Sequence, residues 1–312
     1  MIGNRIAYGK AVHDMALKNN NIVVVDADCI GPLNYSEFVK DFPDRFVECG
    51  IAEQNMVSIA AGIASCGKTV FVGSFAVFST MRALDQVRNQ ICYNNFDVKV
   101  IGTHAGVETG FDGATHQAIE DMAIMRAIPN MRVLAPSTPI MTEKLTYIMG
   151  NTYGPFYMRF GKNPNNELYE ETEEFKIGKS KRLREGNDIT IMACGRMVER
   201  AIEAADMLKR EEGIKARVCD MYSIKPIDTE EIDAAVQDTH IIITVEDHSI
   251  IGGLGSAVCE YIADKSYYCK VFRHGIEDHF GRSGDSESLF LLYGLTADGI
   301  ARKAKKCLNK IK

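Results

Sequence analysis

The sequence predicts an α/β protein with two doubly wound domains. Short runs rich in β-branched residues alternate with segments of helical pattern. Strands that are apolar throughout, with helices between them, are typical of a parallel sheet covered on both faces. The runs also form two series, which a stretch rich in Glu and Lys separates. A chain of 312 residues is long enough for two domains of ordinary size.

The predicted strands follow one another at the spacing that intervening helices require. In the first series they are residues 22–25, 46–47, 69–72, 98–101, 132–134 and 156–158, and in the second they are 189–192, 216–218, 241–245 and 270–272. Between the two series, the chain has few large aliphatic side chains and cannot bury enough apolar area to order itself without help from the rest of the protein. We therefore predict domains at 1–165 and 187–312, joined by a surface linker at 166–186.

Composition excludes several classes of function. The net charge is −6, and no basic run is long enough for nucleic acid or an anionic membrane to be an expected partner. No uninterrupted apolar stretch approaches the roughly 18 residues of a membrane span, and no signal core opens the chain, so we expect a cytoplasmic protein. The nine cysteines are scattered without a CxxC pair, so no zinc site is expected.

One acidic residue stands where a strand leads into a helix. Glu53 follows the predicted strand 46–47, and the small apolar residues 57–64 after it have the pattern of a helix packed on a sheet. A negative charge in the first helical turn is favoured by the helix dipole. On spacing alone, Glu53 is therefore either a helix-terminal acid or a functional carboxylate.

Five further candidates come from their positions after predicted strands. Asp28 ends a strand at the carboxyl edge of the sheet, where ligands bind in open α/β folds. Phe75 and Phe78 have the i, i+3 spacing of ordinary core aromatics. His104 and His116 stand in glycine-containing loop segments, so we expect both to be more exposed to a ligand than core histidines are.

Six stretches in a fixed order resemble the C-terminal half of transketolase, and the resemblance extends from Arg5 nearly to the end of the chain. The stretches are 5–11, 48–56, 74–78 with 82–88, 102–107, 110–117, and 244–248 with 252–255. Each stretch alone is weak support. Their shared order and spacing over about 300 residues make the resemblance specific.

The resemblance implies thiamine diphosphate as the cofactor, which acts as the electron sink when a carbon–carbon bond is cleaved. It gives Glu53 the hydrogen bond to N1′ of the aminopyrimidine. This role needs a carboxyl that exchanges a proton near neutral pH, which dry, apolar surroundings would favour. It gives Phe78 the main stacking contact with the pyrimidine, Phe75 a supporting one, and Asp28 a further cofactor contact.

The resemblance also assigns substrate contacts. It gives Asp112 a contact with a substrate hydroxyl and His116 a catalytic position near the reacting carbonyl. It gives Arg5, His104 and Arg159 the capture of the sugar phosphate, a task that suits arginine because its planar fork binds phosphate through two hydrogen bonds.

Two departures from the family pattern are visible. Pro32 stands where the family often has a serine, which puts one phosphate contact in doubt. The Gly-Asp-Gly motif that holds the diphosphate and its Mg²⁺ or similar divalent ion does not occur in the chain. We therefore expect a separate N-terminal transketolase subunit to supply the diphosphate and metal ligands, in a heterotetramer of two subunits of each kind.

The predicted function is that of the C-terminal subunit of a split transketolase, which transfers a two-carbon ketol unit from a ketose phosphate to an aldose phosphate in the pentose phosphate pathway. The alternatives within the enzyme class are a 1-deoxyxylulose-5-phosphate synthase-like subunit and a 2-oxoacid dehydrogenase beta-like subunit. Thr103-His104 and Arg282-Ser283-Gly284 resemble transketolase more closely than either. A non-catalytic interaction module is a further alternative, although such a module has no need of a cofactor acid.

Overall fold

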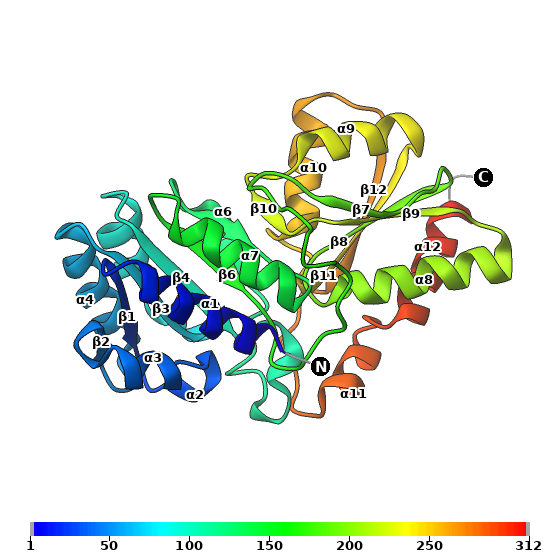
Figure 1. Cartoon of the computed structure of the whole chain (residues 1–312). Helices are drawn as coiled ribbons and strands as arrows, with labels where there is room; N and C mark the ends of the chain where they lie inside the picture. The colour runs from blue at the N-terminus through cyan, green and yellow to red at the C-terminus, as the bar shows by residue number, and fades with distance from the viewer. Residues whose placement is uncertain (1–2, 310–312) are drawn as a thin grey trace.

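The computed structural model describes residues 3–309 and contains two sheets covered by helices (Figure 1). The predicted α/β fold class is confirmed. The first sheet has the strand order β10-β5-β6-β4-β3-β1-β2. Its strands are β1 (Ile22–Asp26), β2 (Phe46–Glu48), β3 (Thr69–Phe75), β4 (Val98–Thr103), β5 (Arg132–Leu134), β6 (Phe156–Arg159) and β10 (Ser223–Lys225). All neighbours pair in parallel except β10, which comes from the second half of the chain and runs antiparallel to β5.

The second sheet has the order β12-β11-β8-β9-β7. Its strands are β7 (Lys181–Arg184), β8 (Ile189–Ala193), β9 (Ala216–Asp220), β11 (Ile241–Ser249) and β12 (Lys270–Ile276). The pairing is parallel except between β7 and β9. The strands expected from the sequence are therefore all present, and β7 and β10 are additional.

Helices cover both faces of each sheet. The helices of the first half are α1 (Asn4–Lys18), α2 (Ile30–Leu33), α3 (Ser36–Asp41), α4 (Glu53–Ser65), α5 (Leu84–Gln86), α6 (Asp121–Ala127) and α7 (Pro139–Gly150). The chain also forms the short 3₁₀ segments η1 (Pro43–Arg45) and η4 (Val107–Asp112) and the π-helical segments η2 (Phe78–Arg82) and η3 (Val87–Cys92). The second half has α8 (Met197–Glu212), α9 (Thr229–Asp238), α10 (Leu254–Asp264), α11 (Ser286–Leu292) and α12 (Ala297–Asn309).

The core follows from the alternation of side chains along the strands. In β1, Val23 and Val25 join the cluster that contains α4, whereas Ile22 and Val24 face the opposite cluster, which contains α1 and α7. In the second sheet, α9 and α10 cover one face, and α8 and α12 lie side by side over the other (Figure 1). Within residues 3–309, no helix combines the length and the apolar character that crossing a membrane requires.

Residues 166–186 lie largely at the surface, and contacts with both halves of the chain order them. Tyr169 and Phe175 are buried in the core of the first half, and the Tyr169 hydroxyl donates to Asp220 Oδ2 at 2.8 Å. The segment ends in β7, which adds an antiparallel edge strand to the second sheet. Two aromatic anchors and an edge pairing therefore order a segment that is poor in aliphatic residues. The domain limits themselves stay a prediction.

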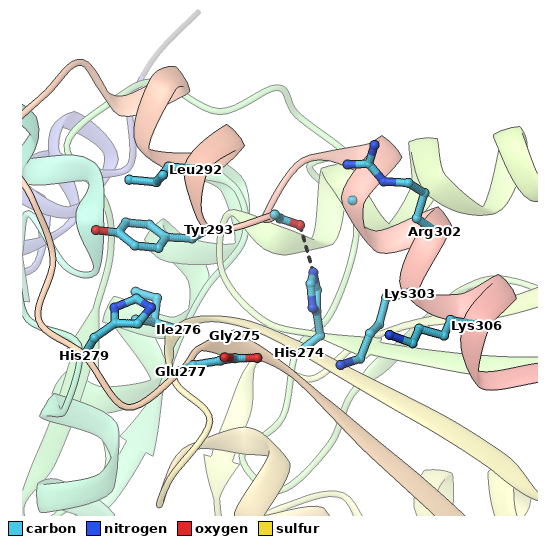
Figure 2. A pocket seen from close by; sticks show the side chains of 12 residues that line it. His274, Gly275, Ile276, Glu277, His279, Leu292, Tyr293, Arg302, Lys303 and Lys306 are labelled. Carbon is cyan, nitrogen blue, oxygen red and sulfur yellow. Dashed lines mark hydrogen bonds between the residues drawn. The ribbon is translucent and has the colours of Figure 1, made fainter. Parts of the chain in front are cut away.

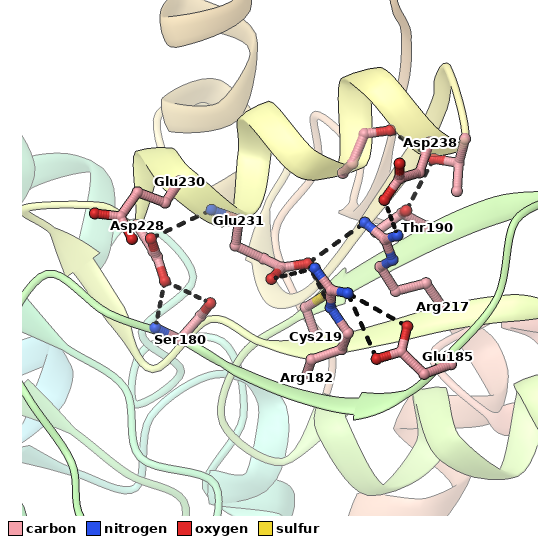
Figure 3. A network of polar contacts seen from close by, with 12 residues as sticks. Ser180, Arg182, Glu185, Thr190, Arg217, Cys219, Asp228, Glu230, Glu231 and Asp238 are labelled. Atoms are coloured by element: carbon pink, nitrogen blue, oxygen red, sulfur yellow. Dashed lines mark hydrogen bonds and ion pairs between the residues drawn. The ribbon is translucent and has the colours of Figure 1, made fainter.

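Charged contacts hold β7 against α9 (Figure 3). Arg182 Nη2 lies 3.0 Å from Glu231 Oε2, and Arg217 on β9 also faces this carboxylate, at 3.7 Å. At the start of α9, the Asp228 carboxylate accepts hydrogen bonds from the backbone N–H and the hydroxyl of Ser180, both at 2.8 Å. These contacts fix the end of the connecting segment on the second half.

A buried lysine in β4 connects this strand to the loop before β6. The Lys99 side chain is fully buried, and its Nζ contacts Asp97 Oδ1 at 2.5 Å and donates to the carbonyls of Thr152 at 2.7 Å and Gly154 at 2.8 Å. Burial lowers the pKa of Lys99 to about 8, against the opposing effect of the Asp97 charge. The lysine therefore carries its charge at neutral pH and satisfies two carbonyls in the loop before β6.

We expect Lys99→Met to lower the free energy of unfolding by about 3–5 kcal/mol, because it leaves the Asp97 charge buried without its partner. Lys10→Met is the matched control, since Lys10 forms an exposed ion pair with Asp14, and such pairs contribute about 0–1 kcal/mol. Urea denaturation of the two variants measures the difference. Equal stability of the two variants would contradict the assigned role of Lys99.

Candidate active site

Glu53 begins α4, and its side chain is only 2% exposed. Its first-turn position is as the sequence predicts, but its surroundings are not apolar. Arg82 Nη1 donates to both carboxylate oxygens at 2.9 Å, and the Arg82 guanidinium lies 4.1 Å from the centre of the Phe78 ring. Phe78 and Arg82 are the first and last residues of η2, so this π-helical segment carries both groups to Glu53.

Two phenylalanines and two histidines gather beside this carboxylate. The rings of Phe75, at the end of β3, and Phe78 are 6.0 Å apart and inclined by 13°. His104 follows β4 and stacks on Phe75 at 4.0 Å and 7°. His116 meets Phe78 edge-on at 5.2 Å and Phe75 at 6.2 Å. The fold therefore brings together the aromatic and imidazole groups that the sequence singled out.

The expectation that both histidines are exposed was wrong for His104. Its side chain is buried because Phe75 covers one face, whereas His116 is partly exposed. Burial, and to a smaller extent the positive charges of Arg5 and Lys162, lower the pKa of His104 to about 3. His104 is therefore a neutral imidazole at physiological pH, and its Nδ1 lies 3.1 Å from Thr103 Oγ1.

Arg5 lies close to His104 and to Pro32, the residue that stands where the family often has a serine. Its Nε donates to the carbonyl of Lys162 at 3.2 Å, and its Nη1 donates to the carbonyl of Pro32 at 3.4 Å. Three nitrogen-bearing side chains, those of Arg5, His104 and Lys162, thus belong to one neighbourhood. Lys162 was not found by sequence reasoning, because neither a motif nor a strand end marks it.

Asp28 and Asp112 are both exposed. Asp28 follows β1 in a left-handed conformation (φ 59°), and its backbone N–H donates to Glu48 Oε1 at 2.9 Å. Asp112 ends η4. In the described part of the chain, neither carboxylate is hydrogen-bonded to another residue that the sequence predicted for the site, so the structure leaves both free to meet a ligand.

Arg159 is not part of this group. Its side chain is buried, and its Nε lies 2.8 Å from Asp121 Oδ2. Its two terminal nitrogens donate to the Asp247 carbonyl at 3.2 Å, and Nη2 also donates to the Ala118 carbonyl at 3.3 Å. The guanidinium is thus engaged inside the protein and is not presented to a sugar phosphate.

The second half of the chain holds the loop that carries Asp112. The Asp247 carboxylate accepts the backbone N–H of Val107 at 3.1 and 3.3 Å. Gly106 has a φ of 67°, and a Cβ there would lie 1.9 Å from Asp247 Oδ2, so only glycine permits this approach. Sequence reasoning noted the stretch 244–248 but assigned it no role.

A second set of contacts comes from the segment before α11. Gln117 Nε2 donates to the Arg282 carbonyl at 2.9 Å, and Ser283 Oγ donates to the Phe111 carbonyl at 2.7 Å. The stretch 282–284, which supported the family resemblance, therefore packs against η4. Both sheets contribute to the conformation of this loop.

The residues present fit an aminopyrimidine. The Arg82 guanidinium is planar, donates two hydrogen bonds to Glu53 and lies over the Phe78 ring, so the space between these two side chains already holds a flat donor group. A ligand ring at that position would have to displace Arg82.

Among residues 3–309, no three His, Cys, Asp or Glu side chains are arranged to hold a metal ion.

Comparison with known proteins covers nearly the whole chain. Residues 1–166 match the pyrimidine binding domain of transketolase, and residues 178–300 match the transketolase C-terminal domain. A Methanocaldococcus jannaschii protein assigned as a transketolase C-terminal section is 45% identical over 99% of this chain and 97% of its own. A subunit of the apulose-4-phosphate transketolase of Phocaeicola vulgatus is 40% identical over 99% of both chains.

A solved structure of a split gene transketolase, in the form of an inactive beta4 tetramer, superposes with a TM-score of 0.89 at 42% identity, covering 99% of this chain and 98% of that one. The two domain matches together span both halves of the chain, and the relatives match it over its full length. Both findings point to the same family. The chain belongs to the transketolase family, as a counterpart of the C-terminal subunit of its split members.

Proposed function

We propose that this chain is the C-terminal subunit of a two-subunit, thiamine diphosphate-dependent transketolase that transfers a two-carbon ketol unit from a ketose phosphate to an aldose phosphate. The observation that carries this proposal is the buried Glu53 carboxylate, which engages a planar donor group over the Phe78 ring. An acid that holds such a group against an aromatic face is the arrangement that the pyrimidine of this cofactor needs.

When bound, thiamine diphosphate would supply the electron sink for carbon–carbon cleavage. Glu53 would hold and exchange the proton at N1′, and Phe78 would pack on the pyrimidine face, with Phe75 behind it. Asp28, exposed at the end of β1, would be a further cofactor contact. Arg82 would leave Glu53 when the pyrimidine enters, and its half-exposed side chain has room to do so.

His116 would bind near the reacting carbonyl of the substrate. It stands edge-on to Phe75 and Phe78 and is partly exposed, so it borders the pocket in which the pyrimidine would lie. Asp112, exposed at the end of η4, would accept a hydrogen bond from a sugar hydroxyl. Because η4 is held by the second half of the chain, both halves would orient the substrate.

The terminal phosphate of the sugar would bind at Arg5 and His104. A charge-assisted hydrogen bond from Arg5 would provide most of the affinity, and the neutral His104 ring would add a directed contact. Arg159, which the family resemblance also assigned to this task, would act instead through its interior ion pair with Asp121. The relative from Phocaeicola vulgatus is named for apulose 4-phosphate, so the carbon skeleton of the sugar can differ between members.

The partner would be an N-terminal transketolase subunit that carries the diphosphate and Mg²⁺ ligands. The absence of Gly-Asp-Gly from the sequence supports this, since hard oxygen ligands for the metal must come from elsewhere. The similar split gene protein was inactive as a tetramer of this type of chain alone. The working unit would be a heterotetramer of two subunits of each kind.

The first prediction concerns this partner. The purified chain should show no ketol transfer and only weak affinity for thiamine diphosphate, because it lacks the ligands for the diphosphate. Mixing it with the N-terminal subunit should restore both, measured by coupled assay and calorimetry. Full activity of the single chain, with contamination by the partner excluded, would refute the two-subunit proposal.

In the reconstituted enzyme, Glu53→Gln should lower turnover by about 10²–10⁴-fold, because an amide keeps a hydrogen bond but cannot exchange the proton at N1′. Glu37→Gln is the matched control, since Glu37 is an exposed acid in the first turn of α3. Steady-state kinetics and exchange of the cofactor C2 proton report the difference, with circular dichroism to check the fold. Normal C2 proton exchange in Glu53→Gln would show that Glu53 is only a helix-terminal acid.

Arg5→Ala should raise the KM for phosphorylated sugars by about 10–150-fold, the equivalent of a charge-assisted hydrogen bond of about 1.5–3 kcal/mol, and leave the KM for glycolaldehyde nearly unchanged. Arg159→Ala should instead lower the free energy of unfolding by about 3–5 kcal/mol and affect both substrates alike, because Asp121 loses its partner. Steady-state kinetics with both substrates measure the change in KM, and urea denaturation measures the change in the free energy of unfolding. If the Arg159→Ala enzyme is stable and its KM rises only for phosphorylated sugars, Arg159 binds the phosphate and the structural role proposed for it is wrong.

A further inference from the structure

A cavity of about 450 Å³ opens in the second half of the chain, between the end of β12 and helices α11 and α12 (Figure 2). None of the candidate active-site residues lines it. Its lining consists of His274, Gly275, Ile276, Glu277, His279, Leu292, Tyr293, Gly294, Gly299, Arg302, Lys303 and Lys306. Its volume lies within the range of roughly 300–1,000 Å³ that small-molecule sites occupy.

One wall of the cavity is basic. Arg302, Lys303 and Lys306 come from α12, where the i, i+3 and i, i+4 spacing brings the third of these side chains onto the same side as the first two. Arg302 is paired with Asp298 at 2.8 Å. Within residues 3–309, neither Lys303 nor Lys306 forms an ion pair or hydrogen bond. Lys305 on the same helix, by contrast, lies 2.9 Å from Glu212.

The opposite wall is apolar and aromatic. Figure 2 shows Leu292 and Tyr293 across the cavity from Arg302 and the two lysines, with His279 beside the tyrosine. The Tyr293 and His279 rings are 5.4 Å apart and inclined by 29°. Leu292 is 55% exposed, so an apolar side chain faces solvent at the mouth of the cavity. A ligand that covered it would gain apolar burial.

The floor supplies hydrogen-bonding groups of both kinds. His274 is partly exposed, and desolvation by its surroundings lowers its pKa, so its ring is neutral at pH 7. His274 Nε2 donates to the Gly294 carbonyl at 2.8 Å, which leaves Nδ1 as an acceptor. The Glu277 carboxylate also lines the floor. These acceptors suit hydroxyl groups of a ligand, and Glu277 disfavours a ligand that is negatively charged along its whole length.

We propose that this cavity binds a small organic phosphate with a planar ring, of the nucleoside monophosphate class. The phosphate lies at Lys303 and Lys306, which bind it as point charges. The ring packs against Leu292 and Tyr293, and the sugar hydroxyls face Glu277. This site is separate from the proposed catalytic site and does not depend on the partner subunit.

The test is calorimetric titration of the full chain with adenosine 5′-monophosphate, adenosine and inorganic phosphate. We expect saturable binding of the monophosphate and at least tenfold weaker binding of the other two. The double variant Lys303→Gln/Lys306→Gln should bind the monophosphate at least tenfold more weakly, since each charge-assisted hydrogen bond lost corresponds to about 10–150-fold. The matched control, Lys305→Gln, removes the same charge from the same helix and should bind within twofold of the wild type.

Two further variants keep the outcome unambiguous. Leu292→Glu, on the opposite wall, should also weaken binding of the monophosphate at least tenfold, and thermal melting checks that each variant is folded. Arg5→Ala should bind it like the wild type, which distinguishes this cavity from the candidate active site. Absence of saturable binding, an equal loss in Lys305→Gln, inorganic phosphate binding as tightly as the monophosphate, or binding lost in Arg5→Ala would each overturn the proposal.

Discussion

The buried ion pair between Arg159 and Asp121 is the interaction on which the rest of the structure depends. A guanidinium in the interior is tolerated only where its charge is paired. Here Asp121 pairs with Nε, and the carbonyls of Ala118 and Asp247 accept hydrogen bonds from the terminal nitrogens. Arg159 ends β6 in the first sheet, whereas Asp247 belongs to β11 in the second. The Asp247 carboxylate in turn accepts the N–H of Val107 at the start of η4. The same contacts therefore join the two sheets and hold the conformation of η4.

The carboxylate at the start of α4 illustrates a second constraint. Glu53 is almost fully buried, and a buried carboxylate needs a partner, which Arg82 provides. The π-helical segment η2 makes this possible, because it sets Arg82 and the Phe78 ring on the same side. π-Helical turns are frequent at functional sites. Cofactor binding would exchange one planar partner of Glu53 for another, so the charge of Glu53 need not become unpaired at any stage.

The second half of the chain has two groups of basic side chains, one paired with carboxylates and one without ion pairs among residues 3–309. Near β7 and α9, Arg182 and Arg217 share the carboxylate of Glu231 in a closed network (Figure 3). At the cavity under α12, Lys303 and Lys306 form no ion pair within the described residues, although the Glu277 carboxylate lines the same cavity. Arg217 and Glu231 are largely buried, so the first network satisfies their charges while it holds β7 in place. Unmatched charge beside an apolar wall, by contrast, favours an anionic ligand.

The sequence by itself determined every strand except β7 and β10, the first-turn position of Glu53 and the proximity of Phe75 to Phe78, because periodicity and helix starts are local properties of the chain. Tertiary structure decided what depends on distant partners. Arg159 meets Asp247, 88 residues away, and no local pattern distinguishes an arginine paired inside from one aimed at phosphate. His104 is covered by the Phe75 ring, and residues 166–186 are ordered by the buried Tyr169 and Phe175 and by the pairing of β7 with β9.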